Sequence, residues 1–263
     1  MTPLKRTWLT VDFDDLRHVP SAQGHPTRSK RPVAGKQLSE PYTLAMKSFE
    51  AWLDTTMHGV TLFVIADLFE SKQFDDWFSA LLAKHGERLT VGCHGLTHRS
   101  WSAWPEDHDG FEASLKRATA VLKEKAGGHF RPWFRAPAGY IAPWMATTLA
   151  TQGYAVDSSV NPSWLVRKKA GKGNSWTNVN DAMLRNGVLE RPWATRFSLP
   201  VNGPALTMFP LSLIAKGAWK KAPSVLTSVE LDAAVPDSTQ PLVTLYWHVL
   251  DHARNNATWS PPL

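Results

Sequence analysis

Short apolar segments alternate with amphipathic helical segments along the chain, and this alternation constrains the fold more than any other feature. Residues 8–14 alternate between apolar and polar side chains, whereas 60–66 form a continuous apolar run typical of a buried parallel strand. Amphipathic helices are predicted over 74–84 and 109–125, each followed within two residues by a glycine. This pattern predicts an α/β fold, and we expect residues 1–263 to form a single distorted (β/α) barrel.

Two further strands and one long irregular segment complete the predicted organisation. Residues 89–93 and 242–248 are predicted strands, and each leads into or ends at a histidine. Residues 161–187 show no clear periodicity, so we expect a long basic loop insertion there. Between residues 160 and 222 the chain has ten Lys or Arg against two Asp or Glu. This excess suggests an anionic ligand near the segment, and a solvated basic surface is an equally good explanation.

Composition excludes several classes of protein. The single cysteine, Cys93, rules out an intramolecular disulfide framework and a zinc site built from cysteines. No apolar run approaches the ~18 residues of a transmembrane segment. The first residues show no secretory signal pattern, so we expect a cytoplasmic protein. There is no glycine-rich phosphate loop, and no recognition motif for nucleic acid accompanies the net charge of +6.

Polar side chains that can carry chemistry stand at the carboxyl ends of predicted strands, where α/β barrels build their active sites. They are Asp12, Asp14, His94, His98, Arg135, Asp157 and His248. Asp14, His94 and His98 offer one carboxylate and two imidazoles, which suit one divalent metal ion. Zn²⁺ fits these ligand types best, and Co²⁺, Ni²⁺ or Fe²⁺ would be accepted by the same set.

Five short motifs, in this order along the chain, resemble those of the polysaccharide deacetylases, also called NodB-homology or carbohydrate esterase family 4 proteins. The motifs are Thr10–Asp15, His94–His98, Phe134–Gly139, Tyr154–Ser159 and Leu245–His248. The resemblance extends from about Trp8 to His252, nearly the whole chain. It implies a barrel of the NodB type that hydrolyses the N-acetyl or a related N-acyl group of an amino sugar.

The resemblance implies a metal centre with a general base beside it. Asp14, His94 and His98 would hold the metal ion, which would polarise the amide carbonyl and activate a water molecule. Asp12 would be the general base that takes a proton from this water. Arg135 would pair with Asp12 and keep it oriented and ionised.

The remaining expected roles concern the leaving group and the oxyanion. His248 would protonate the leaving amine, and the backbone N–H of Ala138 would stabilise the oxyanion. Asp157 would either orient His248 or cap a turn. Three tryptophans in or beside the basic segment are the expected substrate contacts: Trp164, Trp176 and Trp193.

The first motif departs from the family pattern, in which adjacent aspartates are followed by glycine. Either Asp12 is the base and Asp14 the ligand, or Asp14 is the base and Asp15 the ligand. We favour the first assignment because side chains at i and i+2 share one face of a strand. Further departures occur at Gly95, at Ala138 and after the fourth motif, so chitin or peptidoglycan is not the expected substrate.

Three functions remain open on the sequence alone. The first is a metal-dependent N-deacetylase acting on a lipid-linked or nucleotide-linked amino sugar in surface polysaccharide or lipopolysaccharide biosynthesis. The second is a barrel that binds carbohydrate without turnover, and the third is a deacylase of a small non-sugar amide. No nucleic-acid partner is expected, and the sequence does not define the oligomeric state.

Overall fold

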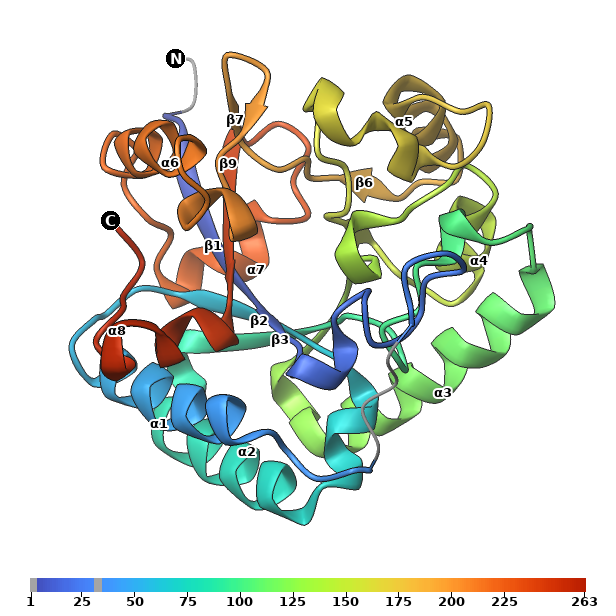
Figure 1. Ribbon diagram of the computed structural model, residues 1–263. Helices are drawn as coiled ribbons and strands as arrows, with labels where there is room; N and C mark the ends of the chain where they lie inside the picture. The colour runs from blue at the N-terminus through green and yellow to red at the C-terminus, as the bar shows by residue number, and fades with distance from the viewer. Residues whose placement is uncertain (1–3, 31–34) are drawn as a thin grey trace.

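In the computed structural model, which describes residues 4–30 and 35–263, seven parallel strands form one curled sheet (Figure 1). The strands are β1 (Arg6–Phe13), β2 (Val60–Val64), β3 (Leu89–Cys93), β4 (Phe130–Phe134), β5 (Val156–Asp157), β6 (Leu189–Glu190) and β9 (Leu242–His248). Their order across the sheet is β6-β5-β4-β3-β2-β1-β9, and each neighbouring pair is parallel. The predicted α/β class is therefore confirmed. Residues 1–3 and 31–34 of the expected domain lie outside the described residues.

Helices cover the convex side of the sheet and its upper rim in Figure 1. They are α1 (Glu40–Asp54), α2 (Lys72–His85), α3 (His108–Ala126), α4 (Met145–Thr151), α5 (Trp176–Arg185), α6 (Leu211–Trp219), α7 (Ser228–Ala234) and α8 (Arg254–Ala257). A short antiparallel hairpin, β7 (Thr195–Arg196) and β8 (Leu199–Pro200), precedes α6. In the described part of the chain, no helix is both long enough and apolar enough to cross a bilayer.

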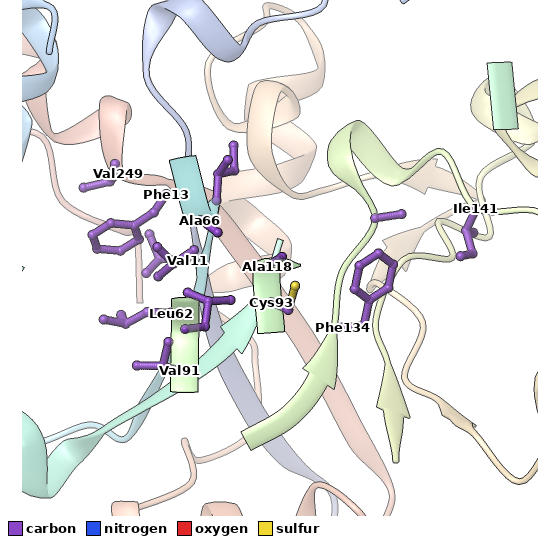
Figure 2. Packing of buried hydrophobic residues seen from close by; sticks show 14 of the residues in the cluster. Val11, Phe13, Leu62, Ala66, Val91, Cys93, Ala118, Phe134, Ile141 and Val249 are labelled. Atoms are coloured by element: carbon purple, nitrogen blue, oxygen red, sulfur yellow. The ribbon is translucent and has the colours of Figure 1, made fainter. Parts of the chain in front are cut away.

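The alternation along β1 separates two hydrophobic clusters. Leu9, Val11 and Phe13 point outward into the main core beneath the helices, where Val11 and Phe13 are drawn in Figure 2. Trp8 points to the inside of the curled sheet and packs edge-on against Trp133, with ring centroids 5.6 Å apart. The arrangement expected from residues 8–14, with apolar side chains toward the helices, is confirmed, and it leaves the inner face free for polar groups.

The sheet curls without closing into a complete barrel. Its edge strands, β6 and β9, do not pair with each other. A single bridge joins the chain after β6 to β9, with Trp193 beside Thr244 and the Ala194 N–H donating to the Thr244 carbonyl at 3.0 Å. Strands β5 and β6 have two residues each and offer too few ladder positions to continue around the barrel. The predicted distorted barrel is thus an open, curled sheet.

The segment 161–187 contains two short helices where the sequence predicts an aperiodic loop. A 3-10 helix spans Trp164–Ala170, and α5 begins after Ser175. The Ser175 hydroxyl accepts from the Asn178 N–H while the Asn178 side chain accepts from the Ser175 N–H, which is a capping box. The buried residues of α5 are Val179, Ala182 and Met183. Trp176 packs against the same core, so the apolar positions recur at i, i+3, i+6 and i+7. This helical spacing is present in the sequence, and the expectation of an aperiodic loop is wrong for this part of the segment.

A short polar ladder crosses the inside of the sheet between β1, β2 and β3. The Trp8 indole N–H donates to the Thr61 hydroxyl at 2.8 Å, and the Thr61 and Thr90 hydroxyls lie 2.8 Å apart. All three side chains are buried, so these bonds satisfy groups that water cannot reach.

Replacing Thr61 by Val keeps the shape of the side chain and leaves the buried Trp8 N–H without an acceptor. We expect the free energy of unfolding, measured by urea denaturation, to fall by about 1–3 kcal/mol. Thr61→Ser is the control, because it keeps the hydroxyl and loses only a methyl group. A smaller loss in Thr61→Val than in Thr61→Ser would contradict this role of the hydroxyl.

Strands β5 and β6 place two buried acids side by side, because Asp157 and Glu190 are register partners. One oxygen of each is bonded, Asp157 Oδ1 to the Ser159 hydroxyl at 2.6 Å and Glu190 Oε1 to the Val160 N–H at 3.1 Å. The other oxygens, Asp157 Oδ2 and Glu190 Oε2, are buried and unpaired among the described residues. Burial, together with the neighbouring Asp157, raises the pKa of Glu190 well above its ordinary value of 4.5. A proton shared between the two carboxyl groups would satisfy both oxygens.

A Glu whose pKa is raised in the folded state contributes most to stability below its ordinary pKa of 4.5, and this contribution is lost as the pH rises toward the folded-state pKa. Glu190→Gln can donate the same hydrogen bond without titrating. We therefore expect the variant to gain in Tm relative to the unaltered protein by at least ~2 °C more at pH 8 than at pH 5. An equal difference at both pH values in calorimetry would show that Glu190 is ionised in the folded protein.

Candidate active site

A cavity of about 570 Å³ opens at the carboxyl ends of β1, β3 and β9. Seven residues singled out from the sequence line it: Asp12, Asp14, His94, His98, Ala138, Trp193 and His248. Parallel strands bring their carboxyl ends to one rim of the sheet, which explains why segments far apart in the sequence meet here. Most of the predicted site is therefore assembled in one place.

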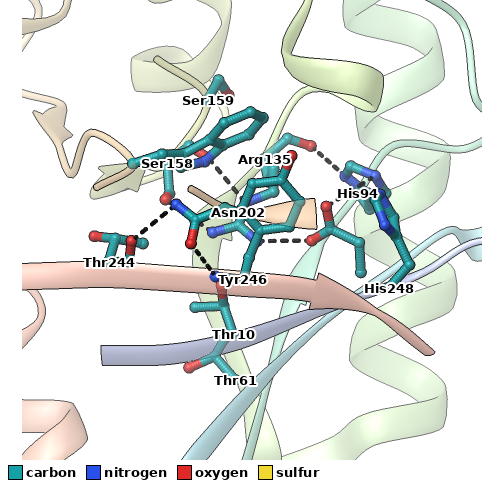
Figure 3. Close-up of polar contacts among 12 residues, drawn as sticks. Thr10, Thr61, His94, Arg135, Ser158, Ser159, Asn202, Thr244, Tyr246 and His248 are labelled. Atoms are coloured by element: carbon teal, nitrogen blue, oxygen red, sulfur yellow. Dashed lines mark hydrogen bonds and ion pairs between the residues drawn. The ribbon is translucent and has the colours of Figure 1, made fainter. Parts of the chain in front are cut away.

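A buried ion pair joins Arg135 to Asp12, and Asp12 lines this cavity. Arg135 is fully buried, and its Nη1 donates to Asp12 Oδ1 at 2.7 Å. Its Nε and Nη2 donate to the carbonyl and the hydroxyl of Ser158 at 2.9 and 3.0 Å (Figure 3). The guanidinium carbon lies 4.2 Å from the ring centroid of Phe63 and 5.1 Å from that of Tyr246. These contacts fix the guanidinium, which in turn fixes the orientation of the Asp12 carboxylate.

His94 faces Asp12 from the end of β3. Its Nδ1 donates to the Arg135 carbonyl at 2.8 Å, which leaves the lone pair on Nε2. Nε2 lies 4.0 Å from Asp12 Oδ2. Burial lowers the pKa of His94 to about 4, so the ring is neutral and able to act as a metal ligand.

Asp14 and His98 are buried beside this group with polar atoms left unpaired. Asp14 Oδ1 and His98 Nδ1 lack hydrogen-bond partners among the described residues. Burial raises the pKa of Asp14 to about 6 and lowers the pKa of His98 well below its ordinary value. The rings of His94 and His98 are 5.5 Å apart between centroids. An unpaired buried carboxylate next to two neutral imidazoles is a donor set that a divalent cation would satisfy.

The structure does not hold these three residues as a closed ligand cluster. Within residues 4–30 and 35–263, no three His, Cys, Asp or Glu side chains converge as a formed metal site. The chemical types, the burial and the unpaired atoms of Asp14, His94 and His98 fit a divalent ion, although the structure does not bring their ligating atoms together around one point. Metal binding at this cavity is therefore part of the proposed function below.

The two alternatives for the first motif differ in where the structure places Asp15. Its Oδ1 accepts from the Leu16 N–H and the Ser39 hydroxyl, and its Oδ2 accepts from the Ser39 N–H at 2.9 Å. Asp15 is thus engaged in capping a 3-10 helix (Leu16–His18) and does not line the cavity. Asp12 and Asp14 are the pair that the structure brings to the cavity.

His248 ends β9 and reaches the cavity on the other side of Asp12. Its backbone N–H donates to Asp251 Oδ2 at 3.1 Å, and its Nδ1 lies 3.8 Å from the same oxygen. Burial alone would lower the pKa of His248, but the charges of Asp14 and Asp251 raise it to about 9. His248 is therefore cationic at neutral pH in this structure, as a general acid requires.

Asp251 is a site residue that the sequence analysis missed. Its Oδ2 accepts from the His248 backbone N–H and lies 3.8 Å from the ring Nδ1, and its Oδ1 accepts from Arg254 Nε at 2.8 Å. Asp157, expected either to orient His248 or to cap a turn, accepts from the Ser159 hydroxyl two residues later, lies beside the β6 acid and does not line the cavity. The signal for Asp251 was an acid three residues after the last motif, a spacing that becomes informative only when the strand leads into a helical turn.

The remaining predicted residues divide between the cavity wall and other parts of the fold. Ala138 lies at the wall in a left-handed conformation, with φ of 50°. Trp193 lines the cavity and donates from its indole N–H to the Ser158 carbonyl at 2.8 Å. Trp164 is 63% exposed and Trp176 packs against the main core, and neither lines the cavity. Of the three expected tryptophan contacts, the structure brings only Trp193 to the site.

Comparison with family models and with curated proteins gives no match. Solved structures do match. A protein of Mycobacterium smegmatis assigned as a polysaccharide deacetylase superposes with a TM-score of 0.55 at 17% identity, over 98% of this chain and 81% of its own. The 4-alpha-glucanotransferase of Thermococcus litoralis superposes with a TM-score of 0.54 at 10% identity, over 98% of this chain and 36% of its own.

At these identities the comparisons show a shared fold. Two of the matching proteins, the glucanotransferase and the branching enzyme of Pyrococcus horikoshii (TM-score 0.50, 10% identity, over 95% of this chain and 64% of its own), have names that denote different chemistry on this architecture. The resemblance to polysaccharide deacetylases that the motifs indicate is confirmed at the level of the fold: this chain has the curled α/β barrel architecture found in the Mycobacterium protein.

Proposed function

We propose that this protein is a metal-dependent hydrolase that removes an N-acetyl, or a related N-acyl, group from an amino sugar. One observation carries the proposal: Asp12 is held by the buried Arg135 between a neutral His94 and a cationic His248, all at one cavity. Acid–base chemistry at an amide needs a group that accepts a proton beside a group that donates one. The deacetylase assigned in Mycobacterium smegmatis, which shares the fold, supports the same reaction class.

The residues of the chain would divide the work of hydrolysis. Asp12 Oδ2, the oxygen not bonded to Arg135, would accept a proton from the attacking water as its oxygen bonds to the acyl carbon. The backbone N–H of Ala138 would stabilise the oxyanion that forms. His248 would donate a proton to the amine nitrogen as the C–N bond breaks, giving a free carboxylic acid and an amino sugar. Asp251 would keep His248 oriented.

A divalent ion would be held by Asp14, His94 and His98. When bound, such an ion supplies Lewis-acid polarisation of the amide carbonyl and activation of the attacking water. The unpaired buried atoms of Asp14 and His98 and the free Nε2 of His94 support this assignment. Zn²⁺ is the metal that these ligand types favour, with Co²⁺, Ni²⁺ and Fe²⁺ as alternatives.

The sugar substrate would be a building block of surface polysaccharide, including lipopolysaccharide, carried on a lipid or a nucleotide. Lys169, from the basic segment between 160 and 222, lines the cavity, and its positive charge supports a phosphate-bearing substrate. Trp193 at the cavity wall, next to Tyr246 with ring centroids 4.4 Å apart, offers an aromatic surface against which a sugar ring can pack.

The test of the function is acetate release from a panel of N-acetylated amino sugars by the protein reconstituted with Zn²⁺. We expect Asp12→Asn to lower kcat by at least ~10²-fold, because an amide cannot take up the proton. Because this change also removes the partner of Arg135, folding is checked by circular dichroism and Tm. His248→Gln, outside the ion pair, should cause a comparable loss. Full activity in both variants would contradict the assigned acid–base pair.

Metal content gives an independent measurement. We expect the purified protein, after reconstitution with Zn²⁺ and desalting, to hold about one ion per chain, and His94→Ala to lose most of it. The matched control is His108→Ala, because His108 is a surface histidine of α3 with 58% of its side chain exposed. Equal metal in all three proteins by plasma mass spectrometry would remove His94 from the ligand set. No metal in any of them would favour a carbohydrate-binding barrel without turnover.

A further inference from the structure

We propose that Lys169 and Arg28 form an anion-binding subsite of the candidate active site, so that the preferred substrate carries a phosphate or carboxylate group close to its acylamide. The inference deepens the proposed function and rests on it for the position of the acylamide. It concerns two cavity-lining residues that the sequence motifs do not include.

Lys169 is a cation inside the cavity without an acidic partner. It belongs to the 3-10 helix Trp164–Ala170, and its Nζ donates to the Ala138 carbonyl at 2.7 Å. The Nζ atom also lies 5.4 Å from the ring centroid of Tyr140. Across residues 4–30 and 35–263, no carboxylate lies within ion-pair distance of this Nζ atom, and its hydrogen-bond partner is a carbonyl. An ammonium group has three N–H donors, so Lys169 retains donors for a bound anion.

Arg28 adds a second positive charge to the same wall. It follows a loop that begins after the 3-10 helix at Leu16–His18, and it lies near enough to lower the pKa of Lys169, which burial brings to about 8. Like Lys169, Arg28 forms no ion pair with any carboxylate of the described residues. Arg28 is exposed to solvent, and both side chains line the same cavity, so an anion bound there would be attracted to both positive charges.

Two other arginines in or near the cavity differ from Arg28 because each is paired with a carboxylate. Arg135 is neutralised by Asp12 at 2.7 Å, and Arg254 by Asp251 at 2.8 Å. Each of these guanidinium groups has its carboxylate in place within the fold. Lys169 and Arg28 are the cavity cations whose charge the described residues leave uncompensated, which distinguishes a site for a ligand from a structural ion pair.

The loop that carries Arg28 is tied to the loop that carries His98. The Gly24 carbonyl accepts from the Ser100 N–H and from the Trp104 indole N–H, both at 2.9 Å. A Cβ on Gly24, whose φ is +82°, would lie 2.0 Å from the His98 carbonyl oxygen. This close approach holds the loop at Gly24 against the candidate metal ligands, and Arg28, four residues later, lines the cavity from an exposed position.

The position of the subsite also indicates where the anion lies on the substrate. Lys169 contacts Ala138, the residue whose backbone N–H is assigned to the oxyanion. An anion on Lys169 would therefore be a few ångströms from the acyl group. Of the ten basic residues between 160 and 222, Lys169 is the one that lines this cavity. Lys169 is therefore the residue of this basic segment that would contact a bound anion.

The experiment compares binding of a neutral sugar with binding of its charged relatives by isothermal titration calorimetry. The probes are N-acetylglucosamine, its 1-phosphate, N-acetylmuramic acid and inorganic phosphate. We expect at least one charged sugar to bind the unaltered protein tenfold or more tightly than N-acetylglucosamine. A preference for the 1-phosphate assigns the anion as a phosphate, and a preference for N-acetylmuramic acid assigns it as a carboxylate.

Variants assign the preference to the proposed residues. We compare the affinity for the preferred charged sugar with the affinity for N-acetylglucosamine. In Lys169→Gln the two affinities should differ by no more than about twofold, and in Arg28→Gln their ratio should be lower than in the unaltered protein but above that value. It should be unchanged in Lys168→Gln, which removes the same charge from a neighbouring exposed residue outside the cavity. A ratio that persists in Lys169→Gln, or that falls equally in Lys168→Gln, would overturn the subsite. So would equal binding of neutral and charged probes to the unaltered protein.

Two further readings separate this proposal from its alternatives. If Lys169 serves only to position Ala138, Lys169→Gln weakens the neutral and the charged sugars equally and the ratio stays as it is, which would overturn the subsite. If the ratio behaves as expected but no probe releases acetate in the presence of Zn²⁺, the proposed hydrolysis fails while the anion subsite stands.

Discussion

The buried ion pair between Arg135 and Asp12 is the interaction on which the rest of the site depends. It joins the end of β4 to the end of β1 across the inside of the curled sheet. An arginine with no solvent exposure is tolerated only when its donors are satisfied, and Asp12 and Ser158 satisfy three of them. The aromatic rings around the guanidinium exclude water and fix its plane. Removing either partner would leave a buried charge unpaired, so the pair couples the geometry of the cavity to the stability of the sheet.

Around this pair, the two faces of strand β1 have different roles: one packs in the core and the other carries the polar groups of the site. Outward side chains of β1 build the core beneath the helices, and inward side chains build the polar interior that ends in Asp12. His248 is the register partner of Asp12 on β9, so the two groups assigned to proton transfer are adjacent because the strands are parallel and in register. The curled sheet stays open between β6 and β9, where Trp193 makes the bridge and also lines the cavity. Trp193 therefore both bridges the open side of the barrel and forms an aromatic wall of the site.

Much of this arrangement could be predicted from the sequence because it follows from local periodicity. The alternation in residues 8–14 placed Asp12 on the inner face, and the carboxyl ends of three strands located His94 and His248 at one rim. A strand was predicted to end at Asp157, and the structure has β5 there, although with only two residues. The helix α5 was missed although it spans ten residues, because its buried positions stand in a segment interrupted by Gly and Asn. Asp251 and Lys169 were also not predicted as site residues, because each acquires its role from a contact with a residue that only the folded chain brings near. Asp157 lay at a strand end, as expected, yet its neighbour proved to be an acid of β6 instead of His248.

The most direct test of this account is an anomalous difference map from crystals of the protein grown with Zn²⁺, measured at the zinc edge. We predict one strong peak bounded by Asp14, His94 and His98, about 2.0–2.1 Å from the nitrogen of each imidazole, with Asp12 still paired to Arg135. A cavity without anomalous density, or an ion held by Asp15 in place of Asp14, would contradict the assignment of this cavity as a metal-dependent hydrolytic site.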